Sequence, residues 1–328
     1  MNSKIYLAAA FALAFAACTN ENEPVTPADG EVAAQVTADI NSVRTRASVG
    51  QWQDGHVIGI STVNTYDAGN KPTPLTDYKN IPYEYDGKAF GPIGRTIYFQ
   101  SPEEVTFFAY YPYKEELNEN GIIDAKTDAD AQERQHEIDF LFTKGAKADK
   151  GNPQVKFIRM NDTEDYSFHH SMSQITITFS EGDDIAFTGG KFESYTLKGL
   201  VLKGTFNTET GDAKVTDGEQ TADLTIRPEN VAVDNKVFAT APVILFPQTP
   251  KFAKEERETP VEGKIGLEVT VEGVTYHATL TIPGGKTALE AGSHYTFPVR
   301  VKKTGLVVGD AEISDWKGIT GDDADATL

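Results

Sequence analysis

Apolar and polar residues alternate with a period of two along most of this chain, which is typical of β-strands that bury one face. The clearest run covers residues 32–40, and the same alternation returns at 174–179 and 294–301. Two alternating runs meet at Glu272-Gly273, which predicts a two-residue hairpin turn. Further strands are predicted at residues 56–63, 95–99, 105–110, 138–143, 154–158 and 243–246.

The run at 32–40 is the first predicted strand. Its polar or small face carries Ala33, Gln35, Thr37 and Asp39, and its apolar face carries Val32, Ala34, Val36, Ala38 and Ile40. Burial of Val32, Val36 and Ile40, with less from the alanines, is expected to contribute about 5 to 9 kcal/mol. That is large beside the stability of a whole domain, which is about 5 to 15 kcal/mol.

Short strands at this density, separated by Gly, Pro, Asn and Asp turns, predict an all-β fold of two antiparallel β-sandwich domains. Two domains are expected because 328 residues exceed what one core usually serves. Residues 124–138 are the exception, since they allow a helical turn or two. Among the strand residues we expect Phe107, Tyr110, Ile175, Ile177, Val269, Val271, Phe297 and Val299.

Polar segments give the expected domain boundaries. Residues 160–167 form the most polar break near the middle of the chain, so we place an N-terminal sandwich at 47–163 and a C-terminal sandwich at 164–328. Residues 19–31 have no apolar periodicity and contain two prolines, which is typical of a flexible tether. This tether and the first strand together make up a segment at 18–46.

The N-terminus has the layout of a secretory signal. Lys4 precedes an apolar run from Ile5 to Ala17, which is shorter than the roughly 20 residues of a membrane-spanning helix. We therefore expect residues 1–17 to be a signal peptide. Cys18 follows directly and is the one cysteine of the chain, so it has no partner for a disulfide or a Cys-x-x-Cys metal site. Its position resembles the lipobox of bacterial lipoproteins, which implies lipidation at Cys18; the alternative is a plain signal peptide with a chance cysteine.

Charge limits the partners of the chain. Lys and Arg number 30 against 49 Asp and Glu, for a net charge of -19. This balance argues against nucleic acid or an anionic lipid surface as a partner.

Catalytic and metal-binding motifs are not found in the sequence. It contains no G-x-S-x-G, G-x-x-x-x-G-K-[ST], G-x-G-x-x-G or H-E-x-x-H string. His169 and His170 are adjacent, so on a strand they face opposite ways; we expect one packed and one solvated rather than a joint metal site. The aspartates at 127–131 and 321–328 do not match a calcium loop. We therefore predict no enzyme activity, no cofactor and no metal.

Two of the eight arginines, Arg44 and Arg46, lie just after the first strand among short polar residues. A solvated connection to the next strand is the simpler interpretation from the residues alone. The other is a cleavage site for an arginine-specific protease on an exposed loop.

Several strings follow one another over most of the chain: RASVGQWQDGHVIGIS at 46–61, VTFFAYYPY at 105–113, IDFLFTKG at 138–145, FHHSMSQITITF at 168–179, APVILFPQT at 241–249, LEAGSHYTFPVRVKKTGLVV at 289–308 and ISDW at 313–316. In this order they resemble the fimbrillins, the Mfa-like pilus subunits of anaerobic Gram-negative bacteria. His56 departs from the pattern, since the family more often has Asp there.

The resemblance implies transthyretin-like sandwiches and a precursor held at the outer membrane through lipid on Cys18. It also implies cleavage after Arg46, or Arg44, by an arginine-specific protease. Cleavage would remove the strand that holds Val32, Val36 and Ile40, and a strand of another fimbrial subunit would fill the groove. We expect the donor strand between Gly305 and Leu328; alternatively, part of this segment is a permanent strand with Trp316 closing its core.

Two other classes stay open. A surface lipoprotein that binds glycans would need exposed aromatic side chains. A hydrolase would need a cleft with two close carboxylates. The candidates for an aromatic glycan platform are Tyr66, Tyr78, Tyr83 and Tyr85.

Overall fold

The computed structural model describes residues 30–40, 52–63, 78–99, 102–229, 231–254 and 258–316. Nearly all regular structure in these ranges is β-strand, which confirms the predicted all-β class. The helical elements of the described chain are α1 (Ala129–Gln132) and the 3-10 turn η1 (Gln135–Glu137), both within the segment predicted to allow helix. The Asp128 side chain begins α1 by accepting a hydrogen bond from the Ala131 N–H at 3.1 Å.

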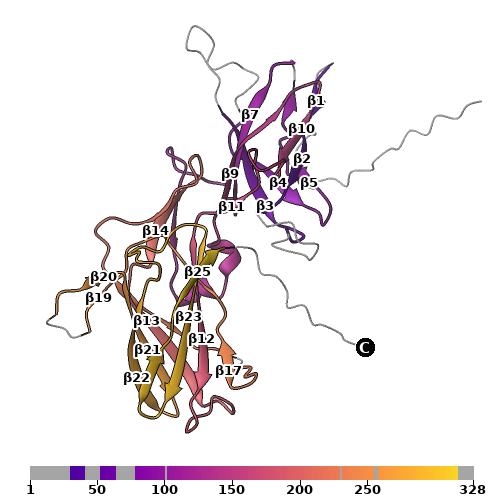
Figure 1. The fold of residues 1–328 in the computed structure, drawn as a ribbon. Helices are drawn as coiled ribbons and strands as arrows, with labels where there is room; N and C mark the ends of the chain where they lie inside the picture. Colours follow the sequence, from indigo (N-terminus) through magenta and orange to yellow (C-terminus); the bar gives the residue numbers. More distant parts are fainter. Residues whose placement is uncertain are drawn as a thin grey trace, which may run out of the picture.

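The first part of the chain forms an eight-stranded sheet in the order β10-β2-β5-β4-β3-β7-β9-β11 (Figure 1). Strand β1 (Val32–Ala33) pairs with β6 (Tyr98–Phe99) beside this sheet. Because β10 also lies close to β9, the sheet curls around its own core. The strands are β2 (Gln35–Ala38), β3 (Val57–Thr62), β4 (Ile81–Tyr85), β5 (Phe90–Pro92), β7 (Val105–Tyr111), β9 (Leu141–Ala148), β10 (Gln154–Phe157) and β11 (His169–His170).

Two facing sheets enclose a second core. One consists of β12 (Ser173–Glu181), β17 (Val237–Ala239), β18 (Val243–Leu245), β23 (Ser293–Lys302), β24 (Gly305–Val308) and β25 (Glu312–Asp315). The other consists of β13 (Phe192–Leu200), β16 (Ala222–Ile226), β21 (Lys264–Val271) and β22 (Val274–Thr281). Their apolar side chains form one continuous cluster, which makes this region a sandwich.

A third, smaller core joins these regions. Strand β8 (Ile122–Lys126) pairs with β14 (Lys203–Asn207), which also pairs with β15 (Ala213–Val215). Phe140 stacks on Phe206 within this core, with ring centroids 4.6 Å apart. A further hairpin, β19 (Lys251–Phe252) and β20 (Val261–Glu262), lies beside β13 and β21. The boundary between 163 and 164 stays a prediction, since β11 beyond it still pairs with β9.

Most predicted strands are present, with three differences. The predicted strand 138–143 begins only at Leu141, because the turn of η1 ends at Ile138. The one at 95–99 is reduced to β6. Two pairs, β2–β10 and β12–β23, are parallel rather than antiparallel, because alternation determines faces and not directions. All eight residues predicted to lie in strands do so, and they are buried as well; Glu272 and Gly273 have φ of 52° and 74° in the predicted turn.

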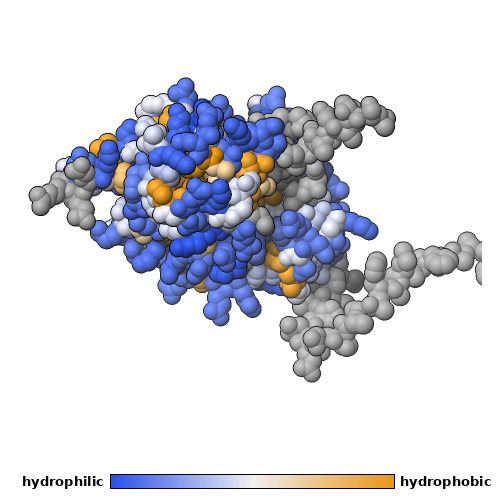
Figure 2. Space-filling model, turned by 90° about the horizontal axis from the view of Figure 1, so that it is seen from below, coloured by the Kyte–Doolittle hydropathy of each residue, from blue (hydrophilic) through white to orange (hydrophobic). Residues whose placement is uncertain are grey.

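The surface is mainly hydrophilic, as a chain with many charged residues requires (Figure 2). Figure 2 shows mainly hydrophilic residues, with apolar ones gathered in small patches. Large apolar side chains exposed in the described ranges are Ile93, Met160, Val237, Val261, Val274 and Val307. Most of the apolar side chains therefore fill the three cores.

Gly211 lies in the turn between β14 and β15, beside the third core, and substitution at this position is expected to destabilise the fold. It has φ of +80°, and a Cβ there would overlap the ring of Phe142 on β9. Gly211→Ala should lower the unfolding free energy by about 1 to 3 kcal/mol more than Gly218→Ala, because overpacking adds to backbone strain. Gly218 is a matched control, with φ of +79° and open space around it. Equal denaturation midpoints for the two variants would contradict this close approach.

Candidate assembly site around the first strand

The first strand has the two faces that its sequence predicts. Ala34 and Val36 are buried, with 9% and 3% of their surface exposed, while Ala33, Gln35, Thr37 and Asp39 are exposed. Val32, Ala38 and Ile40 are half-buried. The expectation that Val32 and Ile40 are buried like Val36 is therefore wrong in degree, because the apolar packing is tightest at the middle of the strand.

Hydrogen bonds hold this strand on both sides. On one side β2 pairs in parallel with β10, and the Asp39 N–H donates to the Phe157 carbonyl at 2.8 Å. On the other side β1 pairs with β6, Val36 is opposite Phe90, and the Ala34 N–H donates to the Ile97 carbonyl at 2.9 Å. The strand therefore lies inside the sheet, and its loss would leave unpaired backbone groups on two neighbours.

Trp52 closes the far end of the strand. Its indole N–H donates to the Ala38 carbonyl at 2.9 Å, and its side chain is buried. The ring makes edge contacts with Phe90 and Phe168, at centroid distances of 5.2 and 5.1 Å. Phe168 also donates its backbone N–H to the Asp39 carbonyl at 2.8 Å. Packing against these rings thus fixes the indole, and the Ala38 carbonyl of the strand accepts the hydrogen bond of its N–H.

A cavity of about 370 Å³ lies where this end meets the C-terminal segment. Ile40 and Trp52 line it on one side, and His170 and Trp316 on the other. The His170 ring stacks on Trp316 at 4.0 Å, and its Nδ1 lies 2.7 Å from Asp139 Oδ1. His169 is exposed, so the prediction of one packed and one solvated histidine is confirmed.

Another histidine, His56, also lines this cavity. Its ring lies 5.0 Å from that of Tyr111. Burial, and then the neighbouring His136, hold the pKa of His56 below its ordinary value. A neutral imidazole is therefore expected at pH 7, and His56 acts here as a packing residue.

The C-terminal segment is part of the sandwich. Strands β24 and β25 both pair with β23. Trp316 is buried, and its backbone N–H donates to the Gly292 carbonyl at 2.6 Å. In the intact chain residues 305–316 therefore agree with the interpretation of sandwich strands closed by Trp316, and their use as a donor strand stays a prediction. The rest of the predicted donor segment, 317–328, lies outside the described residues.

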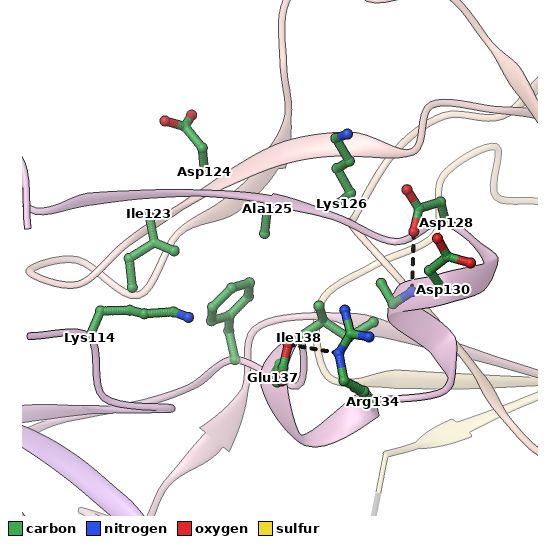
Figure 3. A pocket seen from close by; sticks show the side chains of 12 residues that line it. Lys114, Ile123, Asp124, Ala125, Lys126, Asp128, Asp130, Arg134, Glu137 and Ile138 are labelled. Atoms are coloured by element: carbon green, nitrogen blue, oxygen red, sulfur yellow. Dashed lines mark hydrogen bonds and ion pairs between the residues drawn. The ribbon is translucent and has the colours of Figure 1, made fainter. Parts of the chain in front are cut away.

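A second pocket, of about 310 Å³, lies between β8 and the α1–η1 segment (Figure 3). Ile123, Ile138 and Phe140 are its large apolar residues. Two of its carboxylates have structural partners: Asp128 caps α1, and Glu137 pairs with Arg134 at 3.2 Å. These charges therefore support the local fold.

Several predicted residues are outside or away from this site. Cys18, Arg44, Arg46 and Tyr66 lie outside the described residues. Tyr83 is fully buried, and burial raises its pKa to about 12, while Tyr78 and Tyr85 are half-buried. Tyr78, Tyr83 and Tyr85 therefore do not form an exposed platform for a glycan.

No group of three or more His, Cys, Asp or Glu side chains in the described part of the chain is arranged to hold a metal ion. None of the helices in the described ranges has the length and apolar character needed to cross a membrane.

These features define a β-rich protein whose candidate site is a strand-filled groove rather than a catalytic cleft. The family model described as fimbrillin-like matches residues 45–316, which is most of the chain, and the chain belongs to this family. The resemblance seen in the sequence is thereby confirmed. Membership supports a structural role in fimbriae and assembly with other subunits.

Individual relatives agree with the family. A proposed fimbrium subunit of Bacteroides uniformis, Fim1C, is 26% identical over 309 residues, which cover 90% of this chain and 88% of that protein. The solved structure of a proposed cell adhesion protein from Bacteroides ovatus has the same fold, with a TM-score of 0.66, 24% identity and coverage of 89% and 99%. Another from Bacteroides uniformis has a TM-score of 0.62, 25% identity and coverage of 88% and 100%.

Proposed function

We propose that this chain is a structural subunit of cell-surface fimbriae, exported as a lipoprotein precursor and polymerised by strand exchange after arginine-specific cleavage. The observation that carries the proposal is the first strand, which fills a groove inside the sheet and is followed within a few residues by Arg44 and Arg46. The family match begins at residue 45, between these arginines. This supports treating the first strand as separable from the rest.

The groove supplies the driving force for assembly. Burial of Val36, with partial burial of Val32 and Ile40, stabilises the strand in place by roughly 3 to 6 kcal/mol. After removal of the strand, the exposed apolar groove and the unpaired groups of its two neighbours favour a replacement strand. Another subunit is the proposed source, and its strand pairs with the groove in place of residues 32–40.

Cleavage alone does not release the strand, because its burial and hydrogen bonds persist after one peptide bond is cut. A competing strand must displace it, so assembly is slow and depends on strand concentration. The intact precursor is monomeric, since its groove is filled from within the same chain. This order keeps subunits from polymerising before the protease acts.

The direct test of the function is location. Cells that produce the chain are labelled with antibodies against it and viewed by electron microscopy, beside cells that lack it. We expect label along filaments, and either loss or shortening of the filaments in the deletion strain. Label spread evenly over the cell surface, with filaments unchanged, would instead favour the glycan-binding lipoprotein.

Cys18 is proposed to anchor the precursor at the outer membrane until cleavage frees the rest of the chain. Cells fed a fatty-acid probe should incorporate label into the natural chain, and label should be lost in Cys18→Ser, because no other cysteine is present. Thr19→Ser is the matched control and should keep the label. Equal labelling of the natural chain and Cys18→Ser would contradict lipidation at this residue.

A further inference from the structure

The inward face of the first strand alternates between large and small residues. Its five positions read Val32, Ala34, Val36, Ala38 and Ile40, so large residues recur every four positions and small ones fall between them. Ala34 and Val36, at the centre, are the two that are fully buried. The groove therefore receives side chains of alternating size from this strand.

The alternation of large and small residues distinguishes registers of the strand that the alternation of apolar and polar residues alone does not. A slip by one residue turns the apolar face outward and is strongly disfavoured. A slip by two residues keeps the apolar face inward, and the backbone still offers a carbonyl to the Trp52 indole N–H. It does, however, bring Val to a subsite that holds Ala and Ala to one that holds Val.

Close packing makes this exchange costly. Protein cores have little spare volume, so an extra pair of methyl groups at the Ala34 subsite is overpacked. Alanine at the Val36 subsite leaves a void. At position 38 the indole of Trp52 reaches the backbone carbonyl beside a small side chain. The three central subsites thus favour small, large, small in that order.

We propose that this alternation of size determines the register of the strand in the groove. It also sets the sequence requirement for a replacement: a strand of another subunit with large aliphatic residues every four positions and Ala or Gly between them. The second statement rests on the strand exchange proposed above. The first concerns the intact chain and does not depend on cleavage.

The register can be read by cross-linking in the intact chain. In the structure Thr37 is opposite Lys156, and Gln35 is opposite Gln154, on the parallel pair β2–β10. With Cys18 replaced by Ser, the pair Thr37→Cys and Lys156→Cys reports the native register. The pair Gln35→Cys and Lys156→Cys reports a slip by two residues.

The decisive variant inverts the sizes without changing composition: Val32→Ala, Ala34→Val, Val36→Ala and Ala38→Val. A two-residue slip then restores large residues to the large subsites. We expect the preferred cross-link to change from 37–156 to 35–156, with a ratio altered by at least about tenfold. The control exchanges the outward residues, as Ala33→Asp with Asp39→Ala, and should keep the 37–156 cross-link. An unchanged cross-link in the inverted chain would overturn the proposal.

Two further experiments distinguish failure of the register proposal from failure of strand exchange. If the fourfold variant does not fold, the double variant Ala34→Val with Val36→Ala takes its place. The proposal would again be overturned if this double variant kept both the natural chain's preference for the 37–156 cross-link and its denaturation midpoint. Synthetic peptides of residues 31–41, native and with Ala34→Val and Ala38→Val, are then offered to the chain after arginine-specific cleavage; no slip of the second peptide that keeps its apolar face inward brings small residues to the subsites of Ala34 and Ala38. Preferred uptake of the native peptide supports the sequence requirement, and equal uptake overturns it. If neither peptide enters while the intact chain shifts as expected, strand exchange fails and the register assignment stands.

Discussion

A chain with Arg44→Ala and Arg46→Ala is expected to stay monomeric after treatment with an arginine-specific protease, while the natural chain forms ladders. The physical reason is that the first strand can leave its groove only when the connection at 41–51 is cut. Purified protein with Cys18→Ser and without the signal peptide is digested briefly and followed by size exclusion. Ladders of the natural sequence should survive mild denaturant, because each joint buries an apolar strand.

Arg257→Ala is the matched control, since Arg257 also lies outside the described residues but far from the first strand in sequence. That variant should polymerise like the natural chain. Equal ladders from the chain without Arg44 and Arg46 would show that removal of the strand is not the switch, and the glycan-binding lipoprotein would become the better explanation.

Val36→Asp is expected to have the largest effect on stability of any single change in the first strand. Val36 is 3% exposed and faces the core of the eight-stranded sheet. A carboxylate there has no partner, so a loss of about 3 to 5 kcal/mol in the free energy of unfolding is expected. Chemical denaturation of the intact precursor measures it.

The same variant has a distinctive pH dependence. Burial raises the pKa of the introduced carboxyl above its unfolded value of about 3.9. The part of the loss that comes from the buried charge is therefore full above the raised pKa, decreases as pH falls through it, and is gone below the unfolded pKa, while the part that comes from the lost apolar side chain stays at every pH. Thr37→Asp is the control, because Thr37 is exposed and should change stability by less than about 0.5 kcal/mol. Similar losses in both variants would contradict the groove.

The sequence predicted which face of each strand is buried better than it predicted which strands are paired. Period-two alternation gave the buried face of the first strand, because it depends only on the geometry of an extended backbone. It had no information on which strands are neighbours, so the parallel pairing of β2 with β10 and of β12 with β23 was missed. Strands β8 and β14, whose pairing joins distant parts of the chain, are not among the strands predicted from alternation, and the first residues predicted to allow helix, 124–126, belong to β8.

The candidate site was predictable in outline. The strand at 32–40 could be located because apolar alternation and two arginines lie in one short stretch. The role of Trp52 could not, since its hydrogen bond to the Ala38 carbonyl depends on a turn of the chain that no local pattern specifies. The stacking of His170 on Trp316 joins residues 146 positions apart, and only the fold brings them together.

Cleavage after Arg44 or Arg46 and displacement of the first strand during assembly are tested by the N-terminal residue of the protein in filaments. Filaments sheared from cells are purified, and the subunit is sequenced from its N-terminus. The account predicts Ala47, after cleavage at Arg46, or Thr45, after cleavage at Arg44. A subunit that begins at Cys18, or anywhere before Val32, would retain the first strand in the filament and contradict the account.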